Sequence, residues 1–436
     1  MKKIISIAVL CTFVVLSTFS KLFNAIYSFN EFSTKINPHL KIENKNQTEM
    51  QKVIKNEGQS ISEKIKDYLK SEKISEIEEE IFNSFTKKGE QIGIDKISSD
   101  RYIGEKPTEI EKKFDFAVDE GDIPIEKFTL AQIDCCKSNL ENNNNKTNKP
   151  EFILVRGQDA MHLYDMDKND KNPSIVQIAS QFNALESVSD EPSAVKYWIY
   201  DHTQGPRASL QSILACKHRE SAHLKNKLPD AIKDLLEKCK LKNGKSILEK
   251  YRNLYKNGYL KLFKIMSNED LEILKNFLAE NIGDLNFLSQ WVICNENNVK
   301  QLHVFSAAPS FQGDISKSYW THNFNNSTEN LRRQLLKEIS KIIVVSEYKA
   351  LAQVAAIRSQ ITGKQASLHL TLVGQGAFNN SPEIVKEALM EIKKELKGAN
   401  VKVYLHGYNE TKSWEDACES IGINLTRDFK IQLKYK

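Results

Sequence analysis

Polar side chains follow a largely apolar run at residues 175–179, in the segment IVQIASQFNALES. The run predicts a buried strand, and Asn183 and Glu186 come shortly after it. Ligands bind at the carboxyl ends of strands in open α/β sheets, so both side chains are expected to face a crevice. Asn183 can donate and accept hydrogen bonds with sugar hydroxyls, and Glu186 can act as a general acid or base. The structural alternative is that Asn183 caps a helix that contains Glu186.

A second segment, YDHTQGPRASL at residues 200–210, crowds polar groups before a turn. Gly205 and Pro206 mark that turn, and residues 208–216 have the pattern of a helix start. A glycine turn that leads into a helix offers backbone N–H groups to an anion, with Gln204 and Gly205 nearest to it. The alternative is a capped surface turn in which Asp201 is a structural acceptor.

Glycines follow another predicted strand in LHLTLVGQGAFNNSP, at residues 368–382. Gly374 and Gly376 would let the backbone approach a diphosphate, and successive N–H groups form an anion-binding nest. No Lys-Ser/Thr pair follows the glycines and their spacing is not GxGxxG, so neither common nucleotide-binding fingerprint is present. A plain glycine-rich turn is the alternative. The residues predicted to bind ligand in this loop are Gly374, Gln375, Gly376, Ala377, Phe378 and Asn379.

Strand and helix patterns alternate around these segments. A fourth segment, HVFSAAPSFQG at residues 303–313, could line the same crevice or pack its aromatic residues in the core. Alternation of this kind predicts an α/β fold with a parallel or mixed sheet. Residues 219–288 show helical patterns with no strand between them, and predict a helical insertion at about residues 219–290. The predicted strands are 151–155, 175–179, 302–307, 368–373, 401–405 and 430–435, and the predicted helices are 329–361, 382–396 and 413–420.

The N-terminal residues predict export. Two lysines precede an uncharged apolar run at residues 4–19, so residues 1–22 resemble a signal peptide, or a membrane anchor if they are not cleaved. Cleavage would give an exported protein, secreted or delivered to a host cell. An uncleaved segment would anchor the protein, with membrane contact through residues 1–22 alone. Residues 23–125 are rich in lysine and glutamate, with helical spacing at 49–88, and predict a charged helical region. The domain that contains the motifs then spans residues 126–436.

The composition narrows the class of partner. The chain has 62 basic and 57 acidic residues among 436, and no basic stripe, so no nucleic-acid partner is expected. Its seven cysteines include no CxxC pair, and buried thiols are expected at Cys216, Cys294 and Cys418. Neither a metal ion nor a cofactor is expected.

The three segments IVQIASQFNALES, YDHTQGPRASL and LTLVGQGAFNNSP, in this order, resemble the macrodomain superfamily. The resemblance covers most of the chain after about Glu126. It extends to poly(ADP-ribose) glycohydrolases and, more closely, to bacterial effector macrodomains that act on ADP-ribosylated ubiquitin. It implies a three-layer α/β/α fold with ADP-ribose in a cleft at the strand ends. The loop after residues 175–179 would approach the ribose that bears the scissile bond, and residues 374–380 would surround the diphosphate.

The same resemblance implies a hydrolase that removes ADP-ribose from proteins, ubiquitin among them. The glycohydrolase pattern of a triple glycine and a paired glutamate is reduced here to Glu186-Ser187, which counts against cleavage of poly(ADP-ribose) chains. Effector-type relatives use spaced carboxylates, matched here by Asp190 and Asp201, with Asn183 where an acidic residue can stand. Glu186 or Asp190 would activate water, and Asp201 would orient the distal ribose. Two alternatives stay open: a non-catalytic ADP-ribose reader, and an exported interaction protein with a degenerate macrodomain as scaffold.

Overall fold

The computed structural model describes residues 44–71, 125–141, 148–156, 173–187, 190–192, 194–200, 203–294, 299–322, 324–407 and 411–427. The chain forms two compact units, Met1–Glu57 and Gly58–Lys436, and the fold below is that of the second unit. Among the described helices, none combines the length and the apolar character that a membrane span requires. The predicted export segment, the predicted strand at 430–435, and residues 72–88 of the predicted N-terminal helix lie outside the described residues.

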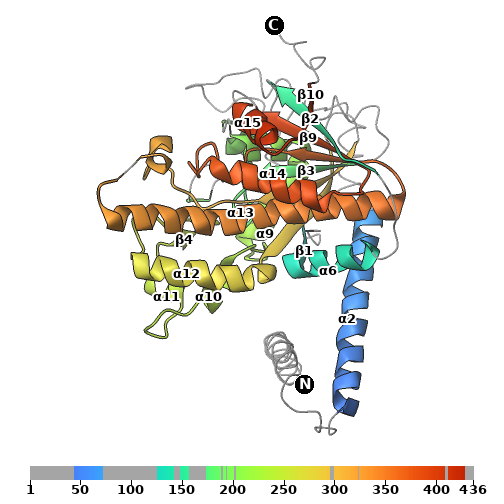
Figure 1. Cartoon of the computed structure of the whole chain (residues 1–436), viewed down its shortest axis with the longest axis horizontal. Helices are drawn as coiled ribbons and strands as arrows, with labels where there is room; N and C mark the ends of the chain where they lie inside the picture. The colour runs from blue at the N-terminus through green and yellow to red at the C-terminus, as the bar shows by residue number, and fades with distance from the viewer. Residues whose placement is uncertain are drawn as a thin grey trace. The chain divides into compact units, whose positions relative to one another are not determined.

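An eight-stranded mixed sheet forms the centre of the second unit (Figure 1), in the order β1-β6-β7-β3-β8-β9-β2-β10. The strands from β7 to β10 in this order run parallel, whereas β6 is antiparallel to both of its neighbours, β1 and β7. The predicted α/β class is therefore confirmed. The strands are β1 Ile125–Thr129, β2 Glu151–Arg156, β3 Ser174–Ala179, β6 Asn286–Ile293, β7 Lys300–Ser306, β8 Ala366–Leu370, β9 Val401–Gly407 and β10 Leu425–Arg427.

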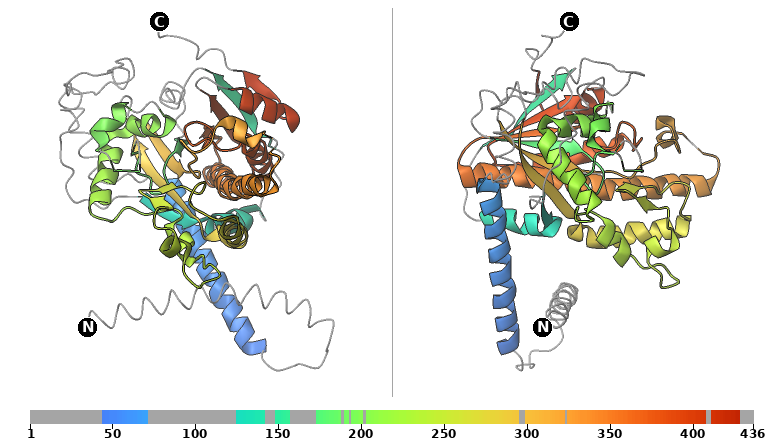
Figure 2. Two further views of the ribbon diagram at one scale, coloured as in Figure 1. Left: turned by 90° about the vertical axis from the view of Figure 1, so that its left-hand side faces the viewer. Right: turned by 180° about the vertical axis from the view of Figure 1, so that it is seen from behind.

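The central strands carry few charges because helices cover both faces of the sheet. All five residues of β8 are buried, as expected for a strand in the middle of a covered parallel sheet. The side view in Figure 2 shows α9 on one side of the sheet, and α13 and α14 on the other. This arrangement gives the three layers expected. The helices include α6 Leu130–Glu141, α8 Gln204–Ser209, α9 Ile213–Leu224, α13 Ser327–Thr362, α14 Glu383–Glu395 and α15 Lys412–Ser420.

The longest helix, α13, has clear start and stop signals. The side chain of Asn326 accepts a hydrogen bond from the N–H of Thr328 at 2.8 Å and so caps the first turn. The helix ends at Gly363, whose left-handed φ of 66° suits glycine. Between these ends, α13 packs against β8 and α14.

The prediction of a purely helical segment at residues 219–288 was wrong in two places. A two-stranded hairpin, β4 Tyr255–Lys256 and β5 Tyr259–Leu260, interrupts the helices, and β6 begins at Asn286. Both turn residues, Asn257 and Gly258, have positive φ values of 44° and 78°. An Asn-Gly pair is a strong hairpin signal, because such a turn needs two residues that tolerate positive φ.

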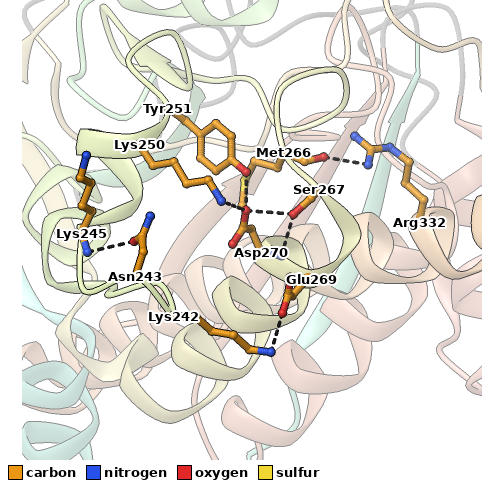
Figure 3. A network of polar contacts seen from close by, with 10 residues as sticks. All are labelled: Lys242, Asn243, Lys245, Lys250, Tyr251, Met266, Ser267, Glu269, Asp270 and Arg332. Carbon is orange, nitrogen blue, oxygen red and sulfur yellow. Dashed lines mark hydrogen bonds and ion pairs between the residues drawn. The ribbon is translucent and has the colours of Figure 1, made fainter.

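The helical part of the insertion is attached to α13 by polar contacts (Figure 3). It comprises α10 Lys233–Lys238, α11 Ile247–Lys250 and α12 Asn268–Asn281. Ser267 caps α12, and its hydroxyl also donates to Asp270, which accepts from Lys250 at 2.6 Å. Arg332 of α13 donates to the carbonyl of Met266 at 2.8 Å. The insertion is thereby fixed to the main domain rather than connected through its two ends alone.

The last part of α2, Asn44–Ser71, belongs to the same core. Leu69 is 2 % exposed, and its carbonyl accepts a hydrogen bond from the buried Arg358 of α13. Trp291 of β6 donates from Nε1 to the carbonyl of Tyr68 at 3.1 Å. The last carbonyls of a helix have no partner within it, so these two donors satisfy the carbonyls of Tyr68 and Leu69 at the end of α2. The expected N-terminal helix thus ends against the sheet.

Candidate active site

A cavity of about 590 Å³ opens where β3 and β8 separate. The two strands pair at Ile175–Leu368 and Val176–His369 and then diverge. In the strand order, the next strand of this sheet after β3 is β6, on the β7 side, whereas the next strand after β8 is its other neighbour, β9. This is a topological switch point, the position at which open α/β sheets bind ligands.

Two glutamine side chains replace the missing strand pairing. Gln177 accepts from the N–H of Thr371 at 3.1 Å. Gln204 accepts from the N–H of Ala179 at 2.7 Å and donates to the carbonyl of Gln177 at 3.1 Å. Gln204, predicted to bind ligand, therefore lines the cavity with its polar group engaged by β3. Its main contribution is to satisfy the backbone where the sheet opens.

The cavity walls come from the segments that follow β3, β7 and β8, from the start of α8, and from β5. Ala308 and Gln312 come from the segment at residues 303–313, which was expected either to line the crevice or to pack in the core. The lining residues are Ala179, Ser180, Gln181, Glu186, Ser187, Thr203, Gln204, Gly205, Pro206, Tyr259, Ala308, Gln312, Thr371, Leu372, Val373, Gly374, Gly376, Ala377 and Phe378.

Glu186 supplies a carboxylate to this cavity. The residue is 2 % exposed and packs against the first turn of α8. A Cβ at Gly205 would overlap the carbonyl oxygen of Ala179 and lie 2.5 Å from Oε2 of Glu186. The segment IVQIASQFNALES therefore meets the segment YDHTQGPRASL, through Glu186 and Gly205. The absence of a side chain at Gly205 allows this close approach.

Gly374 shapes the loop that follows β8. Its φ is 75°, and a Cβ there would lie 2.7 Å from both Cβ of Ala308 and Nδ2 of Asn380. The N–H of Asn380 donates to the carbonyl of Gly374 at 2.9 Å and closes the loop. A side chain at Gly374 would be strained by its conformation and by its neighbours, so glycine is required there.

The tip of the same loop offers backbone donors. Gly376 and Ala377 are exposed at the cavity, and Phe378 packs against Tyr259 with ring centroids 5.5 Å apart. Within the described part of the chain, no hydrogen bond engages the N–H groups of Gly376, Ala377 and Phe378. Three successive N–H groups of this kind can bind an anion.

The other two loop residues predicted to bind ligand face the protein. Gln375 donates from Nε2 to the carbonyl of Ser381 at 3.0 Å. Asn379, with φ of 53°, donates to the carbonyl of Ile315 at 3.1 Å, and its own carbonyl accepts from Trp320. Neither residue is among those that line the cavity. Both hold the loop in shape.

Asn183 has a local structural role. Its Oδ1 accepts from the N–H of Leu185 at 3.1 Å, and its Nδ2 donates to Oδ1 of Asn257 at 3.0 Å. This is an Asx-type turn, which also accommodates Ala184 at φ of 56°. Asn183 thus connects the loop after β3 to the β4–β5 hairpin, and it does not line the cavity.

Of the two acidic residues predicted to act with Glu186, Asp190 alone lies among the described residues. Asp190 is half-buried and forms an ion pair with Lys261 at 2.7 Å. The hydrogen bond from Lys261 holds the pKa of Asp190 below its usual range. Asp190 does not line the cavity, and Asp201 lies outside the described residues.

Tyr259 is the cavity residue that sequence reasoning missed most clearly. It is 6 % exposed, and its hydroxyl donates to the carbonyl of Ser187 at 2.9 Å. The backbone N–H of Phe182 also donates to the carbonyl of Gly258 at 3.1 Å. The Asn257-Gly258 turn signal would have placed Tyr259 on a strand, but not beside residues 180–187, because that contact joins segments about 70 residues apart.

The described residues offer little to a metal ion. No three His, Cys, Asp or Glu side chains among them gather at metal-binding distance. Cys216, Cys294 and Cys418 are buried free thiols, as expected. The polar groups of the cavity are instead one carboxylate, several hydroxyls and amides, and the backbone donors of one loop.

Comparison with known proteins gives a remote match in structure. No family model matches the chain, and no curated protein is similar in sequence. The structure of poly(ADP-ribose) glycohydrolase from Deinococcus radiodurans in complex with ADP-ribose is 10 % identical, with a TM-score of 0.37, over 70 % of this chain and 100 % of that one. A variant with arginine in place of threonine is 10 % identical, with a TM-score of 0.35, over 68 % and 95 %. Similarity this distant assigns no function to the chain.

Proposed function

We propose that the chain binds ADP-ribose in the cavity between β3 and β8 and hydrolyses ADP-ribosyl groups attached to proteins. One observation carries this proposal: Glu186 lines the same cavity of about 590 Å³ as Gly376, Ala377 and Phe378, whose N–H groups have no hydrogen bond within the described part of the chain. The volume lies within the range of about 300–1,000 Å³ that is usual for small-molecule sites. The resemblance of the three sequence segments to macrodomains agrees with this placement.

The loop after β8 is the proposed diphosphate site. A diphosphate presents several anionic oxygens, and the N–H groups of Gly376, Ala377 and Phe378 can donate to them. The Tyr259–Phe378 pair gives the cavity an apolar aromatic wall beside this loop. Binding energy from the diphosphate would fix the ribose relative to the reacting atoms.

Glu186 is the proposed base. In the reaction, the bond between the anomeric carbon and the protein side chain breaks, through a transition state with oxocarbenium character. A water molecule adds to the anomeric carbon and gives one proton to Glu186, and Glu186 passes this proton to the departing side chain. Asp201 remains the residue predicted to orient the distal ribose. Asp190 is the weaker candidate for the base, since its pKa is lowered by Lys261.

A non-catalytic reader is the second candidate, and one observation favours it. Glu186 is the sole carboxylate among the described residues that line the cavity, whereas glycoside hydrolysis commonly uses two. The hydrolase would release free ADP-ribose from modified protein, whereas the reader would bind it without release. Both place ADP-ribose in the same cavity.

Release of ADP-ribose from modified protein tests the proposal. The full chain would be incubated with mono-ADP-ribosylated ubiquitin and, separately, with an unrelated mono-ADP-ribosylated protein, and free ADP-ribose would be quantified by mass spectrometry. Release supports the hydrolase, and the ratio of the two rates measures preference for ubiquitin. Binding of ADP-ribose without release supports the reader. If the folded chain neither binds nor releases ADP-ribose, both functions are rejected.

A further inference from the structure

Tyr348 of α13 lies beneath the start of the loop that follows β8. The residue is 3 % exposed. Its hydroxyl donates to the carbonyl of Thr371 and accepts from the N–H of Val373 at 3.1 Å. One side chain thus bridges two backbone groups immediately after β8 ends at Leu370.

These backbone groups have lost their strand partner. The pairing of β8 with β3 ends at His369, and Thr371 and Val373 are 8 % and 3 % exposed. The N–H of Val373 also donates to the carbonyl of Thr371 at 3.0 Å, so the hydroxyl of Tyr348 bonds both groups of one tight turn. Because buried backbone groups are costly without hydrogen bonds, this contact holds the turn and with it the path of the chain. Gly374–Phe378 begins directly after this bridge, and Thr371 and Val373 line the cavity themselves.

The position of Tyr348 is itself fixed. Its ring packs edge-on against Trp414, with centroids 6.4 Å apart and planes at 84°. Burial raises the pKa of the hydroxyl, which therefore keeps its proton at neutral pH. The preceding residue, Glu347, accepts from the N–H of Ala307 at 3.0 and 3.2 Å at the end of β7. Two adjacent side chains of α13 thus fix the ends of two strands that border the cavity.

We infer that Tyr348 is a positioning residue for the anion-binding loop. It does not line the cavity. Its hydroxyl sets the path of Thr371–Val373 and so the directions of the N–H groups of Gly376–Phe378. The role in ligand binding rests on the proposed function, while the role in fixing the loop does not.

The test uses Tyr348→Phe in the full chain, with Tyr68→Phe as matched control. Each change removes one hydroxyl, and the hydroxyl of Tyr68 bonds Ser289 on β6, on a different part of the sheet. Hydrogen exchange without ligand would be followed in peptides that cover residues 371–380, and affinity for ADP-ribose would be measured by calorimetry. We expect Tyr348→Phe to speed exchange in these peptides and to weaken binding at least tenfold, and Tyr68→Phe to do neither.

Hydrogen exchange and calorimetry distinguish a failure of the positioning role from a failure of the proposed function. Unchanged exchange at residues 371–380 in Tyr348→Phe overturns the positioning role, as does an increase that is equally large across the whole sheet or in the control. If the parent chain does not bind ADP-ribose, the proposed function fails, and the exchange comparison still decides the role of Tyr348.

Discussion

Glu186 and Gly205 depend on each other at the proposed site. The carboxylate is buried against the first turn of α8, at a point where a Cβ at residue 205 would overlap backbone. A second glycine, Gly376, has the opposite environment, with no atom within 4 Å of a Cβ built on it. The two glycines therefore provide a matched pair of substitutions, one that disturbs packing and one that does not.

Gly205→Ala is expected to destabilise the chain and to impair the site. Forcing a methyl group into a packed position typically costs about 1–3 kcal/mol, and here the displaced groups are the carbonyl of Ala179 and the carboxylate of Glu186. Denaturant unfolding would measure the change. Gly376→Ala is the control and should stay within about 0.5 kcal/mol of the parent. Equal stability of the two variants would contradict the described approach of α8 to Glu186.

Glu186→Gln tests the proposed base. The amide preserves the shape of the side chain but cannot accept a proton, and general-base catalysis contributes about 10²–10⁴-fold to rate. We expect turnover of mono-ADP-ribosylated protein to fall by a factor in that range, with affinity for ADP-ribose changed by less than about threefold, since catalytic groups act on the transition state. Parent-like turnover in this variant would remove Glu186 from the mechanism.

The helices and strands with a clear hydrophobic pattern could be predicted from the sequence. Sequence patterns placed β3, β8, α13 and α14 within a few residues of their observed bounds, because a buried strand is a short apolar run and a long amphipathic helix repeats its pattern many times. The hairpin β4–β5 was missed because its strands have two residues each. The start of β6 at Asn286 was also missed, because residues 219–288 were interpreted as helical.

The lining of the cavity was predictable to the extent that it depends on local sequence. Glu186 and the glycines of the loop after β8 follow strands, and strand ends are where ligands bind. The local pattern could not show that Asn183, Gln375 and Asn379 turn toward the protein, since each can serve a ligand or a neighbouring backbone group equally well. Their orientation is decided by tertiary contacts.

Removing the end of α2 should be far more damaging than removing the residues before it. Ile65 and Leu69 are 1 % and 2 % exposed, and Trp291 and Arg358 donate to the last carbonyls of the helix. A chain that starts at residue 58 should unfold cooperatively near the parent temperature. A chain that starts at residue 72 would expose apolar surface and lose the hydrogen bonds that Trp291 and Arg358 donate to α2, at about 1–3 kcal/mol each. Calorimetric melting of both would check this, and equal melting temperatures would refute it.

Acid should destabilise the whole molecule through buried histidines. Burial lowers the pKa of His303 and of His406 to about 3, and of His218 to about 4, below the ordinary value of 6.5. Folding therefore favours the neutral rings. Their contribution to stability is complete above about pH 6.5 and is lost progressively as the pH falls toward the folded-state pKa values.

His218→Leu isolates one of these groups. Each proton taken up on unfolding contributes a slope of about 1.4 kcal/mol per pH unit. Between pH 6.5 and pH 4, we expect the free energy of unfolding to fall less steeply in the variant than in the parent. The difference in slope should be at most about 1.4 kcal/mol per pH unit. Denaturant unfolding across this range would measure the difference. Parallel curves would show that His218 is not a buried neutral ring.

Calorimetric titration of the full chain with ADP-ribose tests the central claim most directly. Gly376→Val is the paired variant, because its side chain would enter open space at the tip of the proposed diphosphate loop without meeting any protein atom within 4 Å of its Cβ. We predict one-to-one binding by the parent chain and binding at least tenfold weaker by Gly376→Val, at unchanged melting temperature. A folded parent chain that does not bind ADP-ribose, or equal affinity in the two proteins, would contradict the proposed site.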